Sequence, residues 1–303
     1  MSSERFLVTG ALGCIGAWTC RLLAEESVPV VGYDLGDNPH RLRLTMSPKQ
    51  LEQIKLVRGD VTDLDQLAAT LDTEGITNVV HLAGLQLPFC KANPPLGARV
   101  NVVGTVNVFE AAKRRGLTTT IAYASTTAVY DEMGAIDPRS HYGVYKVANE
   151  GTARVYWQDD RIASIGLRPF CVYGPGRDQG ITSTPTVAML AAARGEDYRI
   201  SFGGRTQLHY APDVARAFIQ ATRIDRAGAD VYDVGGPAVH MSEVVAAIES
   251  AAPEAKGKIT FEDAPLPFPE ELPGGDFEIP LTPLEEGVRA TIDHFRRQPP
   301  EER

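Results

Sequence analysis

Tyr142 stands four residues before Lys146, and no other tyrosine in this sequence has a lysine at that distance. On a helix the two side chains lie on one face, about one turn apart. An ammonium group beside a phenol favours the phenolate, so we expect the pKa of Tyr142 to fall from about 10 toward neutral pH. The pair is therefore a candidate general base with its activating charge. The alternative is an amphipathic helix in which the two residues have no joint role.

The N-terminal residues predict a nucleotide site. Residues 5–9 are a β-rich run, a turn with Gly10, Gly13 and Gly16 follows, and a helix is expected over 17–25. Glycines let the chain turn sharply and approach a pyrophosphate, whose charge faces the N–H groups of the new helix. Strand, glycine turn and helix in this order are typical of dinucleotide-binding folds. A plain strand-to-helix turn is the alternative.

An acidic residue stands where the second strand is expected to end. Residues 28–33 predict this strand, and Asp34 follows Gly16 by eighteen positions. A carboxylate there accepts hydrogen bonds from both hydroxyls of the adenosine ribose and repels a 2′-phosphate. This favours NAD over NADP, although Arg41 and Arg43 in the following loop keep NADP open.

Strand and helix patterns alternate up to residue 170, which predicts a parallel sheet covered by helices. Strands are expected over 54–58, 78–82, 119–124 and 164–168, and helices from Leu64 with Asp63 as N-cap, over 94–115, and from a Ser140 N-cap to about residue 157. His81 lies in an apolar run and is interpreted as a core histidine. Asp60 is a candidate for the adenine edge.

Three hydroxyl residues, Ser125, Thr126 and Thr127, follow the predicted strand 119–124. Open α/β sheets bind ligands at the carboxyl ends of their strands, so these hydroxyls are candidates for contacts with a substrate oxygen. Turn formation and helix capping are the alternative use of such residues.

Shorter elements are expected after residue 170. The patterns predict helices over 186–193 and 213–222, strands over 198–202 and 231–234, and a proline-rich loop over 265–273. Ser242 is the expected cap of a helix to residue 252. Thr282 is followed by Pro283 and Glu285. This order of an N-cap, a first-turn proline and a glutamate at the third helical position predicts a capped helix to residue 296. Residues 299–303 are expected to be disordered.

Composition narrows the class of protein. The chain has 303 residues, 43% of them hydrophobic and 23% charged, and a net charge of −9. The negative charge argues against nucleic acid or an anionic membrane as a partner. No apolar run is long enough to span a bilayer and the first residues do not form a signal peptide, so we expect a cytoplasmic protein. The four cysteines have no metal-ligand spacing and are expected to be reduced, with no metal bound.

With these motifs in this order, the whole chain resembles the extended short-chain dehydrogenases/reductases, the NAD-dependent epimerase/dehydratase group. The residues that carry the resemblance are 9–16 (Thr-Gly-Ala-Leu-Gly-Cys-Ile-Gly), 59–63 (Gly-Asp-Val-Thr-Asp), 81–84 (His-Leu-Ala-Gly), Asn101, 129–130 (Val-Tyr), 142–146 (Tyr-Gly-Val-Tyr-Lys), 168–170 (Arg-Pro-Phe) and 172–175 (Val-Tyr-Gly-Pro).

The resemblance implies an α/β fold, a doubly wound parallel (Rossmann) sheet with a smaller, discontinuous C-terminal substrate lobe. Residues 1–170 would form the NAD-binding domain, with later segments near 205–234 returning to it, and 171–303 mainly the interleaved substrate-binding lobe. It also implies a homodimer in which the helices near 94–115 and 140–157 pair into a four-helix bundle.

The resemblance and the residues together give a predicted site. The expected catalytic residues are Tyr142, Lys146, Thr126 and Ser125. The expected NAD-binding residues are Gly10, Gly13, Cys14, Ile15, Gly16, Asp34, Asp60, Val61, Leu82, Ala83, Gly84, Asn101, Tyr142, Lys146, Pro169 and Val172. The expected substrate-binding residues are Gln86, Thr126, Thr127, Gln207, His209 and Tyr210.

Two departures from the nucleotide-sugar members of the family affect the expected substrate. The asparagine that often follows their aromatic residue is Cys171 here, and the arginine of their diphosphate-binding segment falls on Thr206, with Arg205 only adjacent. We therefore expect an oxidoreductase that transfers a hydride between NAD and a small hydroxylated substrate, such as a sugar acid, sugar or hydroxy acid. A nucleotide-sugar epimerase or dehydratase with transient NAD reduction is one alternative, and a non-catalytic NAD-sensing or scaffold protein is another.

Overall fold

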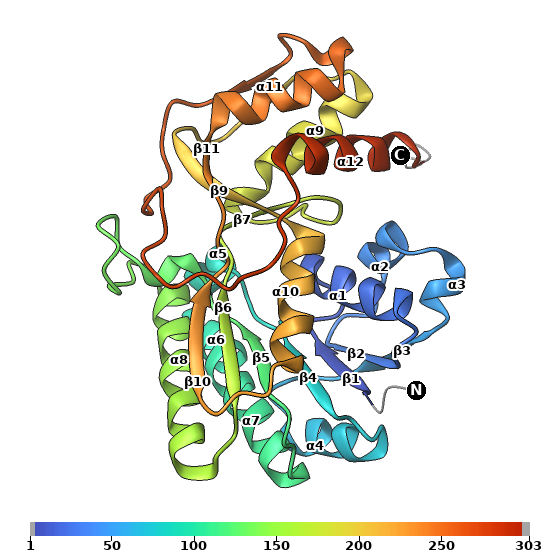
Figure 1. Ribbon diagram of the computed structural model, residues 1–303, viewed down its shortest axis with the longest axis vertical. Coiled ribbons are helices and arrows are strands. Elements are labelled where there is room, and N and C mark those ends of the chain that lie inside the picture. Colours follow the sequence, from blue (N-terminus) through green and yellow to red (C-terminus); the bar gives the residue numbers. More distant parts are fainter. Residues whose placement is uncertain (1–3, 299–303) are drawn as a thin grey trace.

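A computed structural model describes residues 4–298 of the protein, which are built around one seven-stranded sheet (Figure 1). Its order is β10-β6-β5-β4-β1-β2-β3, and every pair in it is parallel. The order reverses between β1 and β4, the place where such sheets bind dinucleotides. The strands are β1 (Phe6–Thr9), β2 (Val30–Asp34), β3 (Ile54–Arg58), β4 (Asn78–His81), β5 (Ile121–Ala124), β6 (Ser164–Arg168) and β10 (Ala229–Asp233).

Helices cover both faces of this sheet, which confirms the predicted doubly wound fold. On one face α1 (Cys14–Glu25) packs beside α10 (Ala211–Arg223), and on the other α4 (Leu64–Thr73), α7 (Gly104–Arg115) and α8 (His141–Asp160) lie together (Figure 1). Each layer buries its own apolar core against the strands. Four short helices complete this part of the chain: α2 (His40–Thr45), α3 (Pro48–Leu51), α5 (Leu87–Ala92) and α6 (Pro94–Ala98).

A second group of elements lies above the carboxyl edge of the sheet (Figure 1). Two small sheets and three helices enclose a separate apolar core. The elements are β7 (Cys171–Tyr173), β8 (Tyr198–Ile200), β9 (Arg205–Tyr210), β11 (Ala238–His240) and β12 (Ile259–Phe261), with α9 (Thr184–Arg194), α11 (Met241–Ala251) and α12 (Leu284–Arg296). Four of these strands were not predicted, because strands of three to six residues carry too little alternation to be recognised. The division of the chain into two domains near residue 170 stays a prediction.

Several helix boundaries differ from the sequence prediction. Helix α1 begins at Cys14, three residues early, so Gly16 lies inside its first turn. Ser242 does not cap α11. The N-cap is His240, whose ring accepts a hydrogen bond from the backbone N–H of Ser242. Thr282 does not cap α12 either, since its hydroxyl donates to Asp213 and α12 begins only at Leu284. The predicted caps Asp63 and Ser140 are confirmed by bonds from the backbone N–H groups of residues 66 and 143.

The predicted helix over 94–115 is continuous but changes its winding in the middle. Residues Arg99–Val103 form a π-helical turn between α6 and α7. Such turns widen the helix, free a carbonyl from the regular ladder and are often found at functional sites. Here the turn carries Asn101, one of the predicted site residues.

A strap of residues 262–283 connects the upper group of elements back to the sheet. It descends past the end of β10 and returns to α12 (Figure 1). Gly274 N–H donates to the Asp233 carboxylate at 2.7 Å, and Thr282 donates to Asp213 through both its N–H (2.7 Å) and its hydroxyl (3.1 Å). Two carboxylates of the sheet layer therefore fix the strap at two points.

A buried charge network joins the carboxyl ends of β5, β6 and β10. Arg168 donates to both oxygens of Glu150 at 2.8 and 2.7 Å, and Glu150 also accepts from the Ser125 hydroxyl at 2.5 Å. Tyr130 donates to the Asp233 carboxylate and lies against Arg168. Burial raises the pKa of Asp233, although the Arg168 charge opposes that rise. The single guanidinium thus compensates two buried carboxylates.

Replacing Arg168 with Met should therefore destabilise the protein strongly. Removing one partner of a buried ion pair leaves an uncompensated charge and costs about 3–5 kcal/mol. Arg226→Met is the matched control, because its ion pair with Asp230 is solvent-exposed and should contribute less than about 1 kcal/mol. Urea unfolding of the three proteins measures both values. Equal losses for the two variants would contradict the role given to the network, and Glu150→Gln should recover part of the loss in the Arg168→Met background.

Candidate active site

The glycine turn is packed so tightly that no larger residue fits at two of its positions. Gly10 has φ +70°, and a Cβ there would lie 2.7 Å from the Ala83 nitrogen. A Cβ on Gly16 would lie 2.1 Å from the Gly10 oxygen. The turn therefore holds the end of β1 against the end of β4 and the start of α1. This bare backbone at a helix N-terminus fits a dinucleotide pyrophosphate.

Asp34 sits at the end of β2 beside this turn. One carboxylate oxygen accepts from the Leu12 N–H and the other from the Gly36 N–H, both at 3.0 Å. The carboxylate thus fixes the turn and keeps free lone pairs for ribose hydroxyls. Arg41 pairs with Asp178 at 2.6 Å and donates to the Leu12 carbonyl at 3.0 Å. Because these contacts occupy Arg41, the arrangement fits NAD better than NADP.

The ends of β3 and β4 carry the other residues predicted to face the cofactor. Asp60 accepts from the Thr62 N–H at 2.8 Å, and Val61 packs against Gly104. The Thr9 hydroxyl oxygen accepts from the N–H groups of Leu82 and Ala83, at 3.2 Å each. These strand ends are held by local hydrogen bonds, and their contacts with NAD stay predictions.

His81 is a core residue, as its apolar surroundings predict. Its ring lies between the hydroxyls of Thr9 (2.7 Å) and Thr105 (3.0 Å). Burial, and next the Lys146 charge, lower the pKa of His81 to about 3, so the ring is neutral. Since the Thr105 hydroxyl donates to the Asn101 carbonyl at 2.7 Å, it is left to accept from His81 Nε2–H, and Thr9 donates to Nδ1. This hydrogen-bond chain links the glycine turn to the π-helical turn.

Tyr142 and Lys146 lie one turn apart on α8, as predicted. Lys146 is only 5% exposed, and its Nζ donates to the Ala124 carbonyl at the end of β5 at 2.7 Å. The same Nζ lies 5.7 Å from the centroid of the Tyr142 ring. Burial lowers the pKa of Lys146 to about 8, opposed by the nearby Cys90 and Glu150. The lysine is therefore a buried ammonium whose proton is held more weakly than in water.

The expectation that Lys146 depresses the pKa of Tyr142 is wrong for this structure. The pKa of Tyr142 is raised, first by burial, while a hydrogen bond with Thr126 and the Arg177 charge lower it. The physical reason is desolvation, which disfavours the phenolate more than these contacts favour it. The helical spacing alone could not show how deeply the phenol lies.

The three hydroxyls after β5 have different partners. Ser125 is 3% exposed and its hydroxyl is bound to Glu150, so in this structure it belongs to the buried charge network. The Thr126 hydroxyl accepts from the Ala128 N–H at 3.2 Å and contacts Tyr142. Thr127 begins a short 3-10 turn and is buried. Thr126 is the hydroxyl that the fold brings to the tyrosine.

Asn101 lies in the π-helical turn beside Lys146. Its amide nitrogen donates to the carbonyls of Leu85 (3.2 Å) and Gly97 (3.0 Å), while its buried Oδ1 has no partner among residues 4–298. A Cβ on Gly84 would lie 2.7 Å from this oxygen and 3.7 Å from Lys146 Nζ. Only a glycine at position 84 leaves the space between Asn101 and Lys146 open.

The predicted substrate residues lie on β9 and near α5. Gln207 and His209 are buried, with His209 Nδ1 accepting from the Phe170 N–H at 3.0 Å. Tyr210 packs against Tyr173 and Trp18, which makes it part of an aromatic cluster. Gln86 lies close to Gly180. Pro169 and Val172 flank the start of β7, and their predicted contacts with NAD are untested.

Sequence reasoning missed Arg177. It follows the glycine-containing loop after β7, and its charge lowers the pKa of Tyr142. No motif spacing marks an arginine in this loop, and the nearest signal was the loop sequence itself.

Comparison with known proteins identifies the family. The sequence profile described as "NAD dependent epimerase/dehydratase family" matches residues 6–235. This chain belongs to that family. The match confirms the resemblance drawn from the motifs.

Individual relatives of the NAD dependent epimerase/dehydratase family agree with this result. UDP-glucuronate 4-epimerase 1 of Arabidopsis thaliana is 33% identical over 182 residues, which are 56% of this chain and 42% of that protein. UDP-glucose 4-epimerase of Mycolicibacterium smegmatis is 28% identical over 325 aligned residues, 97% of this chain and 99% of that protein. The first Arabidopsis relatives are thus matched over only 40–42% of their own length.

A solved structure supports the cofactor. UDP-glucose 4-epimerase of Thermus thermophilus, in complex with NAD, is 26% identical with a TM-score of 0.74, covering 97% of this chain and 99% of the other. Together with the family match, it confirms NAD as the expected cofactor.

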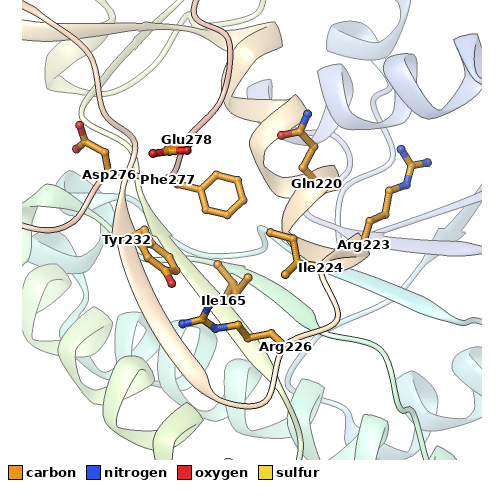
Figure 2. A pocket seen from close by; sticks show the side chains of 9 residues that line it. All are labelled: Ile165, Gln220, Arg223, Ile224, Arg226, Tyr232, Asp276, Phe277 and Glu278. Atoms are coloured by element: carbon orange, nitrogen blue, oxygen red, sulfur yellow. The ribbon is translucent and has the colours of Figure 1, made fainter.

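A cavity of about 460 Å³ lies elsewhere, between α10, β6, β10 and the strap (Figure 2). Its walls include Ile165, Tyr232 and Phe277, and none of the predicted site residues (Figure 2). The two arginines at its rim are already paired, Arg223 with two glutamates and Arg226 with an aspartate. Both arginines of this cavity are therefore already compensated, and neither is a free cation for an anionic ligand.

Two further kinds of feature are absent from residues 4–298. No helix in this range is both long and apolar enough to cross a membrane. No three His, Cys, Asp or Glu side chains in it are grouped so that they could bind a metal ion.

The depressed pKa of Lys146 predicts a specific pH dependence of stability. Between pH 8 and about 10.5 the unfolded chain keeps the Lys146 proton that the folded protein has lost, so the free energy of unfolding should rise with pH. Relative to Lys146→Met, wild type should gain on the order of 3 kcal/mol across this range. Urea unfolding of both proteins from pH 7 to 10.5 measures the difference. A difference that stays constant with pH would show that the buried lysine titrates normally.

Proposed function

We propose that this protein is an NAD-dependent dehydrogenase that oxidises a carbinol carbon of a small hydroxylated compound, such as a sugar acid, sugar or hydroxy acid, and releases NADH. The observation that carries the proposal is the contact between Cys171 and Thr206, whose side chains lie 3.3 Å apart and are buried. These are the two positions at which nucleotide-sugar members of the family have the asparagine and arginine of diphosphate recognition.

The Cys171–Thr206 pair provides no positive charge. Burial raises the pKa of Cys171 to about 12, so the thiol is neutral. The adjacent Arg205 donates to the Ala238 carbonyl and lies 3.8 Å from Glu243, so its charge is partly compensated. A diphosphate needs cations or backbone donors to replace its water, and this pair offers neither.

Gln207, the next residue on β9, fits a hydroxylated substrate better. Its amide nitrogen donates to the Gly236 carbonyl at 2.8 Å, and its buried Oε1 has no partner among residues 4–298. His209 Nε2 is also buried near the Gly235 carbonyl but outside hydrogen-bond geometry. Residues two apart on a strand point to one face. An acceptor and a donor on one face are suited to the hydroxyl groups of a sugar-like molecule.

The chemistry follows from the chain's own groups. In its phenolate form Tyr142 accepts the proton of the substrate hydroxyl as the hydride leaves the carbinol carbon, and as the phenol it returns that proton in the reverse direction. Thr126 hydrogen-bonds the same oxygen as its charge changes. The Lys146 ammonium keeps positive charge near the phenol and is placed to bind the nicotinamide ribose. NAD, held by Gly10, Gly13, Gly16, Asp34 and Gly84, would supply the hydride acceptor.

A nucleotide-sugar 4-epimerase is the second candidate function, because both the Mycolicibacterium and the Thermus relatives are named UDP-glucose 4-epimerases. Such an enzyme would use the same Tyr142, Lys146 and Thr126 but retain NADH for re-reduction of the substrate. The two candidates therefore differ in substrate size and in NADH release.

We also propose that the protein is a homodimer that pairs through the helical run 94–115 and α8. Leu96 and Val103 are each 46% exposed on the helical run 94–115, and Val144 and Val155 are 49% and 53% exposed on α8. Val144 and Val155 are about three turns apart and share a face. Gly151, between them, faces open space. Two neighbouring helices with exposed apolar stripes mark an interaction surface.

Replacing Tyr142 with Phe should abolish turnover and spare NAD binding. We expect kcat to fall by about 10²–10⁴-fold, the usual contribution of a general base, while the Kd for NAD changes little. The measurement follows NADH absorbance with aldonates, aldoses, hydroxy acids and UDP-, GDP- and dTDP-sugars. Steady NADH release with a small compound supports the dehydrogenase.

Tyr145→Phe is the matched control, because Tyr145 lies on the same helix and its hydroxyl only donates to the Pro94 carbonyl at 2.9 Å. It should keep wild-type turnover. Interconversion of a UDP-sugar without net NADH formation would refute the proposed dehydrogenase and support the epimerase. An unchanged rate in Tyr142→Phe would refute Tyr142 as the general base, and a wild type that binds NAD but turns over none of these compounds would favour the NAD-sensing alternative.

Introducing charge at the exposed stripes should separate the proposed dimer. In the double variant Val103→Arg, Val155→Arg, two desolvated guanidinium groups per chain would oppose association. Sedimentation velocity should then show a monomer where wild type shows a dimer. Met133→Arg is the control, since Met133 is 90% exposed on a loop and should leave the dimer intact. A wild-type protein that sediments as a monomer would refute the assignment.

A further inference from the structure

The loop 173–180 is fixed over the glycine turn on both sides of Arg177. On one side the Pro175 carbonyl accepts from the Trp18 indole N–H at 2.9 Å. On the other, Asp178 pairs with Arg41, which also donates to the Leu12 carbonyl. The neighbours of Arg177 thus position the loop, and the Arg177 side chain is not needed for that purpose.

The Arg177 guanidinium has few partners. Its Nη2 donates to the Thr182 hydroxyl at 3.1 Å, and its buried Nε has no hydrogen-bond partner. Among residues 4–298, no carboxylate lies within 4 Å of it. Arg168, by contrast, is compensated by Glu150 at 2.7 Å. Arg177 is therefore a half-buried positive charge without a counter-ion.

The position of this charge is central. Burial raises the pKa values of Tyr142 on α8, Cys14 on α1 and Cys171 on β7, and the Arg177 charge opposes all three rises. Its Nη2 and the Gln86 oxygen both approach the same side of Gly180, at 3.2 and 2.6 Å from the point where a Cβ would lie. The guanidinium thus lies among the glycine turn, the tyrosine and the predicted substrate residues.

We propose that Arg177 binds an anionic group of the substrate, the carboxylate of a sugar acid or hydroxy acid, next to Tyr142. The inference rests on the proposed function and selects the acids among its substrate classes. A guanidinium presents two parallel N–H donors that match a carboxylate, and partial burial strengthens such a contact. Arg177 would then determine specificity, holding the acid so that a neighbouring hydroxyl reaches Tyr142 and Thr126.

The test compares matched ligands that differ only in charge. Quenching of NADH fluorescence on the NADH-loaded enzyme gives the affinity for gluconate and for glucitol. Wild type should bind gluconate at least tenfold more tightly, and Arg177→Gln should lose about 10–100-fold for gluconate but little for glucitol. Arg177→Lys should keep part of the preference. Arg199→Gln is the control, because Arg199 is 65% exposed, and it should behave as wild type.

UDP-glucuronate and UDP-glucose form a second pair of ligands that differ in the carboxylate. With this pair, the carboxylate site at Arg177 can be tested independently of the proposed dehydrogenase activity. If the enzyme interconverts UDP-sugars, the dehydrogenase fails, yet selective loss of UDP-glucuronate affinity in Arg177→Gln still supports the carboxylate site. Equal binding of both members of each pair by wild type would overturn the site. A more than tenfold weaker Kd for NAD in Arg177→Gln would overturn it as well, because the guanidinium would then serve the cofactor.

Discussion

Two buried charges on one face of α8 hold the catalytic helix against the sheet, and the geometry of the site depends on them. Lys146 donates to the Ala124 carbonyl at the end of β5, and Glu150, one turn later, accepts from Ser125 and Arg168. Both side chains are at most 5% exposed. Buried charges are tolerated only when they are paired and hydrogen-bonded, so α8 cannot slide or rotate without breaking these contacts. The relative position of Tyr142 and Thr126 follows from this attachment.

Burial also determines the direction in which the pKa values of Lys146 and Tyr142 are shifted. It lowers the pKa of the Lys146 ammonium and raises the pKa of the Tyr142 phenol, each in favour of its neutral form. The phenol thus holds its proton more tightly than the ammonium does, and its ionisation requires positive charge or hydrogen bonds that offset the desolvation. Arg177 and Thr126 already act on the phenol in the direction of ionisation.

Much of this arrangement could be predicted from local sequence, and the failures have physical causes. The glycine turn, Asp34 and the pair Tyr142 and Lys146 are found by spacing, because the geometry of a βα unit and of a helix fixes where they lie. The spacing of residues does not show how deeply a side chain is buried, so the predicted direction of the pKa shift of Tyr142 was wrong. Ser125 and Thr126 look alike in sequence, and only the tertiary contact with Glu150 separates their roles. Thr282 has the pattern of a cap, but a carboxylate 69 positions away takes its hydroxyl instead.

The strap ties the last part of the chain to residues made much earlier, and this has a consequence for biosynthesis. Its anchors, Asp213 and Asp233, belong to elements that complete the sheet layer, while α12 fills the core of the upper elements only after the strap has passed. During translation the N-terminal βα units emerge first and can fold locally. The upper core, by contrast, stays open until α12 leaves the ribosome. Its apolar surface is thus shielded later than that of the sheet layer, and the nascent chain depends longer on protection there.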